Sequence, residues 1–224
     1  MMLMPDGGIT MPVRLQTARK IAKGRREHFT GQFTFGSDES QTMDIESNTE
    51  LRVAFVILAR PGVVDLENQV PFAWVKPNGA QATHYFDFRA LFADGRRRAI
   101  IVKSEYRRRQ PQVQTELAHI AAQVTPEFAD EVVVMTDRDI DPVEYFNAEM
   151  MHEMRRPDPE ADAAARRLKG EIVASAQIQD LVETIGLGAR GFRAVVRLLR
   201  SHELELVDNT RIDHEVYVRR RINK

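Results

Sequence analysis

The sequence predicts an α/β fold with a mixed sheet flanked by helices, followed by a smaller domain of helices and short strands. Between residues 45 and 140, a helix pattern is followed by three strand patterns, a second helix pattern and one more apolar strand. A helix between two strands of one sheet implies that those strands are parallel, so the sheet is mixed. From about residue 160 the pattern changes to helices and short strands. We therefore expect a basic and polar arm over 1–40, a sheet domain over 41–155 and a second domain over 156–224.

The first helix is predicted over residues 46–59. Its apolar residues recur at helical spacing, at Leu51, Ala54, Phe55 and Leu58. Asp44 or Ser47 is placed to cap its start, and Pro61-Gly62 ends it.

Three strands are predicted next, over residues 63–76, 83–92 and 98–103. Pro77-Asn78-Gly79 and Asp94-Gly95 separate them and are typical of hairpin turns. On the second strand, Asp87 faces away from its neighbours Phe86 and Phe88, because side chains alternate between the faces of a strand. The continuous apolar run of the third strand predicts burial on both faces. A helix over 112–124, a buried strand over 131–136 and a helix over 143–154 complete the domain.

Residues 155–164 are polar and contain two prolines, which predicts a linker or domain edge. Two helices joined by Ile185-Gly186-Leu187-Gly188 follow, then strands over 204–207 and 215–220 that flank Asp208-Asn209. Helix, turn, helix and a two-stranded wing form the arrangement of a winged helix.

The second of these helices has an apolar side that we expect to face inward, formed by Phe192, Val195, Val196 and Leu199. Arginines recur at spacings of three and four on the opposite side, at Arg190, Arg193, Arg197 and Arg200. Three readings stay open: a solvated face, a DNA-recognition helix whose arginines contact phosphates and base edges, or a surface that docks another protein.

Composition and charge limit the function classes. The chain has 224 residues, a net charge of −1 and no cysteine, which excludes disulfides and thiolate metal sites. It has no apolar run of the roughly 20 residues that a membrane helix needs, and its start lacks the features of a signal peptide, so we expect a cytoplasmic protein without a membrane partner. Basic blocks over 14–26, over 96–109 and from Arg190 onward indicate a polyanionic partner, and nucleic acid is the expected one.

Four short motifs follow one another in a set order. They are Ser47-Asn48-Thr49-Glu50, Gln69 and Pro71 within a first strand, His84-Tyr85-Phe86-Asp87-Phe88, and Val102-Lys103. With the order of the elements and the wing, they make residues 40–220 resemble the TnsA-type transposon endonucleases of the PD-(D/E)XK nuclease superfamily.

This resemblance implies a Mg²⁺-dependent DNA endonuclease. Asp87 would be the central metal ligand, Glu50 would be a second ligand or orient a water, and Lys103 would be the catalytic lysine. Mg²⁺ prefers oxygen ligands, polarises a phosphate and lowers the pKa of a bound water, and a neighbouring lysine offsets developing charge. Double-stranded DNA would be the substrate, with a transposase or an ATPase as a protein partner, and a homodimer is left open.

Ile101 departs from the family pattern, because the family places Glu, Asp or Gln two residues before the lysine. Isoleucine has no side-chain oxygen, so we expect Mg²⁺-dependent cutting to be weak or lost. Glu105, if the strand continues, and Gln110 or Gln114 are alternative sources of a ligand. The competing functions are a winged-helix transcription regulator and a non-catalytic assembly protein. The plain alternative is that Glu50 is a surface acid, Asp87 a solvent-facing strand residue and Lys103 a strand end.

Overall fold

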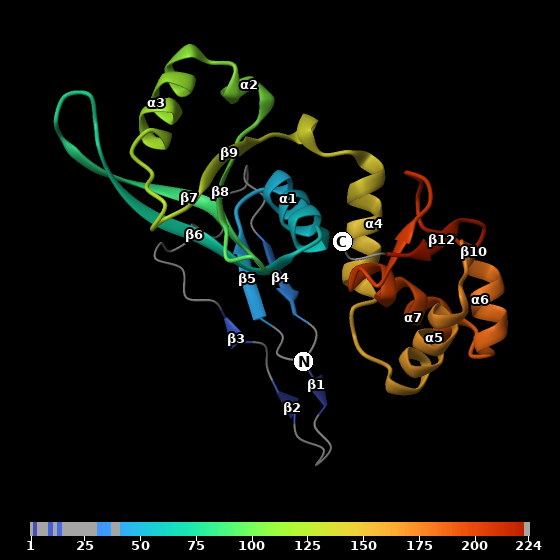
Figure 1. Cartoon of the computed structure of the whole chain (residues 1–224). Coiled ribbons are helices and arrows are strands. Elements are labelled where there is room, and N and C mark those ends of the chain that lie inside the picture. The colour runs from blue at the N-terminus through green and yellow to red at the C-terminus, as the bar shows by residue number, and fades with distance from the viewer. Residues whose placement is uncertain (1, 4–8, 11–12, 15–30, 37–40, 222–224) are drawn as a thin grey trace. The chain divides into compact units, whose positions relative to one another are not determined.

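The computed structural model describes residues 2–3, 9–10, 13–14, 31–36 and 41–221, and the chain divides into two compact units (Figure 1). The first unit comprises Met1–Phe35 and Glu39–Asp141, and the second comprises Gly36–Asp38 and Pro142–Lys224. The sequence predicts a boundary after residue 155, whereas helix α4 (Pro142–Glu153) belongs to the second unit. The Asn147 amide explains this, since it donates to the Thr210 carbonyl at 2.9 Å and accepts from the Ile212 N–H at 2.8 Å.

The first unit contains a four-stranded mixed sheet in the order β6-β7-β8-β9, which confirms the predicted mixed sheet. Its strands are β6 (Val63–Val75), β7 (Gln81–Phe92), β8 (Arg97–Val102) and β9 (Glu131–Met135). The first three pair antiparallel, and β9 is parallel to β8. The helical segments of this unit are α1 (Asn48–Ala59), α2 (Glu105–Arg108), α3 (Pro111–Ala121) and the short 3₁₀ helix η1 (Asp137–Asp139).

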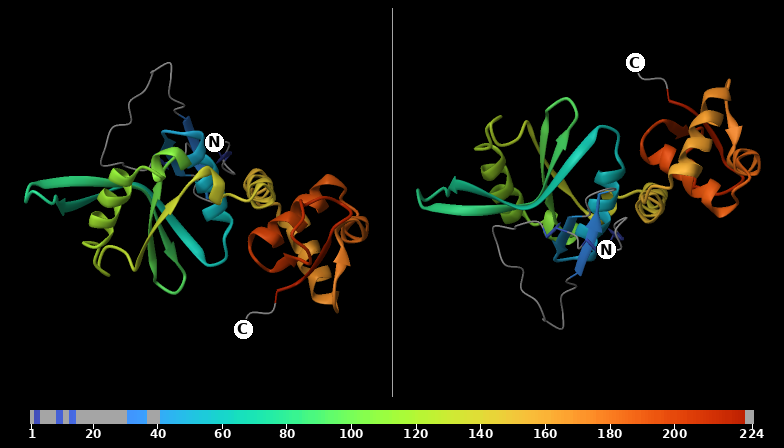
Figure 2. Two further views of the ribbon diagram at one scale, coloured as in Figure 1. Left: turned by 90° about the horizontal axis from the view of Figure 1, so that it is seen from above. Right: turned by 90° about the horizontal axis from the view of Figure 1, so that it is seen from below.

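Strands β7 and β8 diverge near the middle of the sheet. Their pairing ends at Phe88 and Ile100, whereas β7 pairs with β6 as far as Gln81 and Val75. The end of the β6–β7 hairpin therefore extends beyond the rest of the sheet (Figures 1 and 2). Next to the divergence, Gln69 has a φ of 51°, a conformation that residues other than glycine rarely adopt.

The arm predicted over residues 1–40 contains strands where it is described. Strands β1 (Met2–Leu3) and β2 (Ile9–Thr10) pair with each other, and β3 (Val13–Arg14), β5 (Gln41–Ile45) and β4 (Gly31–Phe35) form a second sheet in that order. Phe33 is buried, and its ring lies 5.5 Å from that of Phe55 on α1. Of the basic block over 14–26, every charged residue after Arg14 lies outside the described residues.

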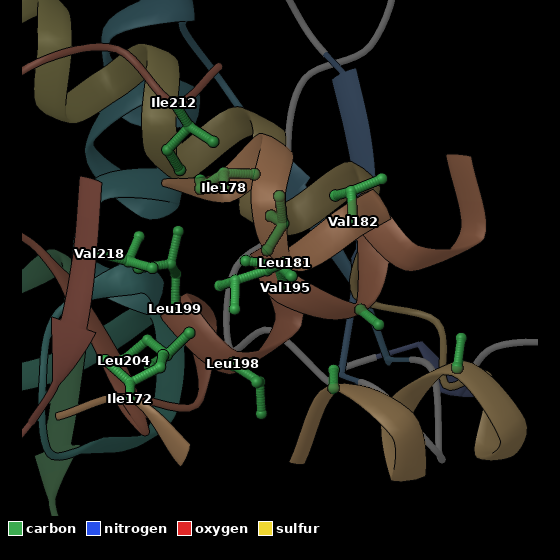
Figure 3. Packing of buried hydrophobic residues seen from close by; sticks show 14 residues of the cluster. Ile172, Ile178, Leu181, Val182, Val195, Leu198, Leu199, Leu204, Ile212 and Val218 are labelled. Carbon is green, nitrogen blue, oxygen red and sulfur yellow. The ribbon is translucent and has the colours of Figure 1, made fainter. Parts of the chain in front are cut away.

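The second unit is built around the apolar cluster drawn in Figure 3. After α4 it contains α5 (Pro159–Glu171), β10 (Ala176–Gln177), α6 (Ile178–Ile185), α7 (Ala189–Arg200), β11 (Leu204–Leu206) and β12 (Tyr217–Arg220). Strand β12 lies between β10 and β11 and is antiparallel to both. The two predicted helices and the paired strands are present. Of the apolar residues that we expected to face inward, Val195, Val196 and Leu199 are buried and Phe192 is partly buried.

Helix α5 begins inside the segment that the sequence predicts as a linker. Asp158 caps it by accepting a hydrogen bond from the Ala161 N–H, and Pro159 occupies its first position. Proline is favoured at that position because its missing N–H would have no partner inside the helix. Among the helices that the described residues form, none has the length and apolar character needed to cross a membrane.

Candidate functional site

Asp87 lies where β8 separates from β7, and its carboxylate bridges the gap between the strands. Oδ2 accepts a hydrogen bond from the Val102 N–H at 2.7 Å, and Oδ1 accepts one from Gln69 Nε2 at 3.5 Å. The Asp87 carboxylate thus accepts a hydrogen bond from the Val102 N–H, which lies beyond the paired part of β7 and β8. The left-handed backbone of Gln69 stands beside it, and strained conformations of this kind are concentrated at functional sites.

Lys103 follows the last residue of β8, and its backbone N–H donates to the Met135 carbonyl of β9 at 3.0 Å. Its ammonium Nζ lies 3.8 Å from Asp87 Oδ2 and donates to the Val102 carbonyl at 3.1 Å. The Lys103 side chain is 33% exposed and that of Asp87 is 13% exposed. The pair is therefore reachable from solvent on the lysine side.

Glu50 occupies the third position of α1, where its carboxylate closes the helix start. Ser47 Oγ accepts from the Glu50 N–H at 3.1 Å and donates to Glu50 Oε1 at 3.0 Å, while Oε2 accepts from the Glu46 N–H at 3.0 Å. Serine followed three residues later by glutamate is the sequence pattern of a capping box. The Ser47–Glu50 motif therefore has a local structural role, whatever else Glu50 does.

Electrostatics places Glu50, Asp87 and Glu46 in one cluster. Burial, with a contribution from the charge of Asp87, raises the pKa of Glu50 to about 7. Burial also raises the pKa of Asp87, and the charge of Glu46 adds to this, while Lys103 and the Val102 N–H oppose it. The three residues singled out from the sequence are thus brought together. Glu46 was missed, and its only signal is an acid one residue before the helix cap.

His84 is a further group close to Lys103. Burial, and then the positive charge of Lys103, lowers the pKa of His84 to about 4, so the imidazole is neutral at pH 7. Its ring packs edge-on against Phe86 at 4.9 Å, and its buried Nε2 has no hydrogen-bond partner among the described residues. A neutral imidazole nitrogen that is free in this way can bond a ligand group beside Lys103.

Ile101 lies on β8 one residue beyond the last β7–β8 pair, Phe88–Ile100, where the two strands have separated. The Ile101 side chain is fully buried in an apolar cluster that also contains Ile120 of α3. The position two residues before Lys103 therefore holds a buried hydrocarbon and offers no side-chain oxygen.

The alternative ligand sources do not replace the missing oxygen. Strand β8 ends at Val102, so Glu105 lies in α2 instead of on the strand, and its Oε1 is bonded to Arg109 Nε at 2.7 Å. Gln110 and Gln114 stand at the start of α3, without a contact to Asp87 or Glu50 among the described residues. Within the same part of the chain, no three His, Cys, Asp or Glu side chains are placed to hold a metal ion. With a buried isoleucine at position 101, these residues do not complete a magnesium site.

The four arginines predicted to face DNA do not form one free surface. Arg190 Nε lies 2.7 Å from Asp158 Oδ2, and its Nη2 lies 2.7 Å from Glu160 Oε2. Arg197 Nε lies 2.7 Å from Asp162 Oδ1, and that side chain is only 11% exposed. The missed signal is the acidic run at 158–162, which the linker prediction set aside.

The other two arginines differ from each other. Arg200 is half-buried, and burial lowers its pKa. Arg193 is exposed, and within the described part of the chain its guanidinium has no ion-pair partner. Arg193 is therefore the member of the set that is most available to a partner.

Comparison of the chain with protein-family models and with curated proteins finds no match. What the chain does must therefore be inferred from its own residues. The two features that bear on function are the carboxylate–lysine cluster (Glu46, Glu50, Asp87 and Lys103) and the contacts between α5 and α7.

Replacing Glu50 by glutamine is expected to stabilise the protein above pH 7. The folded protein holds a proton on Glu50 up to about pH 7, whereas the unfolded chain releases it near 4.5, so this residue lowers the free energy of unfolding as pH rises between those values. Glutamine keeps a side-chain oxygen that can accept from Ser47 Oγ or the Glu46 N–H. We expect a gain on the order of 2–3 kcal/mol at pH 8 and little change at pH 4, measured by urea unfolding.

The matched control is Glu116→Gln, which neutralises an exposed carboxylate on α3. It should leave the pH dependence of stability unchanged. If Glu50→Gln and wild type showed the same slope between pH 4.5 and 8, Glu50 would not be the buried, charge-coupled acid described above.

Proposed function

We propose that this protein binds double-stranded DNA on a scaffold similar to the TnsA-type endonucleases of the PD-(D/E)XK superfamily, and that it cuts DNA weakly or not at all with Mg²⁺. One observation carries the proposal. Glu50, Asp87 and Lys103 come together where β7 and β8 diverge, while position 101, two residues before Lys103, is a fully buried isoleucine. The scaffold of a phosphodiesterase is thus combined with an incomplete ligand set.

The order of elements supports this assignment. Helix α1, the antiparallel strands β6, β7 and β8, helix α3 and the parallel strand β9 follow the order that the superfamily resemblance implies. In the second unit, α5, β10, α6 and α7 precede the β11–β12 hairpin, and β10 pairs with β12. Helices followed by a hairpin wing are typical of winged-helix domains.

The chemistry of the cluster argues against cutting. A bound Mg²⁺ would be held by Asp87 and Glu50 and would polarise a phosphate, but the place for a further oxygen ligand is taken by Ile101. Without a cation, the carboxylates of Asp87, Glu50 and Glu46 disfavour a phosphate, and burial followed by the charge of Asp87 already raises the pKa of Glu50. Lys103 and the neutral His84 are the groups there that suit a phosphate oxygen.

A non-catalytic assembly role is the second candidate, and the pairing of Arg190 and Arg197 with acids of α5 favours it. Arginines used inside the unit cannot also reach DNA phosphates without breaking those pairs. A helix of this kind suits docking onto another protein, such as the transposase or ATPase of a mobile element or a second copy of this chain. Arg193 would then be the main arginine of α7 open to DNA.

The wild-type protein is expected to bind duplex DNA and to leave plasmid DNA largely uncut in Mg²⁺ or Mn²⁺. Binding is measured by fluorescence anisotropy over a salt series, and cutting by conversion of supercoiled plasmid to open circles. Asp87→Ala should bind as wild type does and also fail to cut. Strong wild-type nicking that vanishes in Asp87→Ala would show that another group completes the site. An absence of DNA binding at low salt would favour the assembly role.

A further inference from the structure

Helix α2 presents an aromatic ring to solvent shortly after Lys103. Tyr106 is 75% exposed, although tyrosine usually packs its ring and leaves only the hydroxyl in water. Ser104 caps this turn by accepting from the Arg107 N–H at 3.3 Å. The ring therefore stands on a turn of defined conformation.

The other charged side chains of α2 hold the turn in place. Arg109 Nε bonds to Glu105 Oε1 at 2.7 Å, and Arg108 Nη1 lies 3.4 Å from Asp139 Oδ2 in η1. Arg107 differs from these, because it is exposed and its guanidinium has no ion pair with any residue that the structure describes. The charged neighbours of Tyr106 and Arg107 are thus paired within the fold, whereas these two side chains are exposed to solvent.

The charge around them suits a polyanion. Residues 103–109 contain four cations and one acid, a net charge of +3. The exposed start of α3 adds Gln112, Gln114 and Thr115 before its first acid, Glu116. An exposed aromatic ring beside an unpaired arginine is the combination that binds nucleic acid strands, with the ring stacked on a base and the arginine on a phosphate. Stacking needs an open base face, which an unpaired strand end has and the interior of a duplex lacks.

We infer that Tyr106 and Arg107 bind the unpaired end of a DNA strand beside the carboxylate–lysine cluster. Tyr106 stacks on a terminal or overhanging base, and Arg107 contacts a phosphate next to it. Lys103 lies three residues before Tyr106, so the bound strand leads toward the Asp87–Lys103 pair. This inference rests on the proposed DNA-binding function and adds the form of DNA that the first unit prefers.

The test compares the full-length protein on a blunt duplex and on the same duplex with a short single-stranded overhang, by fluorescence anisotropy. Wild type should bind the overhang duplex more tightly than the blunt one. Tyr106→Ala should lower the affinity for the overhang duplex by roughly tenfold, the usual scale of one base stack, and so remove the preference. Tyr106→Phe keeps the ring and should keep the preference. Arg107→Ala should weaken binding to both duplexes and reduce the salt slope by about 1.

Lys76→Ala is the matched control, because it removes one positive charge from an exposed position at the β6–β7 turn. It should change neither the preference nor the salt slope, and thermal unfolding should show that all variants fold as wild type does. If wild type binds both duplexes equally, or if Tyr106→Ala keeps the preference, the inference is overturned while the proposed function stands. If wild type binds neither duplex, the proposed function fails and the inference fails with it.

Discussion

Replacing Ile101 by glutamate is expected to destabilise the metal-free protein by about 4 kcal/mol and to make its stability depend on divalent cations. Ile101 is fully buried in an apolar cluster that includes Ile120 of α3, so a carboxylate there would be enclosed by hydrocarbon side chains. On the proposed nuclease-like scaffold, position 101 would supply a ligand beside Asp87, so Mg²⁺ or Mn²⁺ bound by the two carboxylates would remove much of that penalty. Urea unfolding with and without each cation measures the effect.

Ile100→Glu is the matched control for this experiment. Ile100 is equally buried and adjacent on β8, but its side chain points to the other face of the sheet. Both variants should lose stability in chelator, and only Ile101→Glu should recover it with added cation. Equal recovery of the two variants, or recovery of neither, would contradict the placement of position 101 beside the candidate metal ligands.

The elements that the sequence predicted best are those whose signals are local. The hairpins at Pro77-Asn78-Gly79 and Asp94-Gly95 follow turn chemistry, and in both the glycine adopts a positive φ. The burial of β8 follows from its unbroken apolar run. These signals require no knowledge of distant contacts, so single-sequence reasoning finds them.

The features that the sequence did not predict depend on pairing between segments far apart in the chain. Strands β4 and β5 do alternate apolar with polar residues, but they are short and border a Gly- and polar-rich segment, and the packing of Phe33 against Phe55 of α1 is a contact that spacing does not reveal. Helix α5 was not predicted because two prolines in this segment favour a linker, although Pro159 is in fact the first residue of the helix. Glu46 joins the site through its proximity to Asp87, which no spacing rule reveals.

The candidate site was predictable to the same extent. The convergence of Glu50, Asp87 and Lys103 followed from the order of motifs, whereas the capping role of Glu50 and the end of β8 before Glu105 emerge only from the hydrogen bonds. The arginines of α7 show the opposite error. Helical spacing predicts that they share one side of the helix, but spacing cannot say whether that side faces water or another helix.

Replacing Arg197 by methionine is therefore expected to lower stability by about 3 kcal/mol, whereas Arg193→Met should change it by less than about 0.5 kcal/mol. Arg197 is 11% exposed, as is its partner Asp162, so the methionine variant leaves a buried carboxylate without its cation. Arg193 lies on the same helix and is exposed, which makes it the matched control. Urea unfolding measures both variants, and the Asp162→Asn and double variants complete a cycle that isolates the pair.

The same two variants should show the reverse order of effects on the salt dependence of DNA binding. Arg193→Met is expected to reduce the salt slope of DNA affinity by about 1, because one phosphate contact is lost, while Arg197→Met should leave the slope unchanged as long as the protein is folded. A free recognition helix would give the opposite pattern for Arg197: unchanged stability and a smaller salt slope. If that pattern were observed, the Arg197–Asp162 pair would not persist in solution, and the face of α7 toward α5 would have to open when DNA binds.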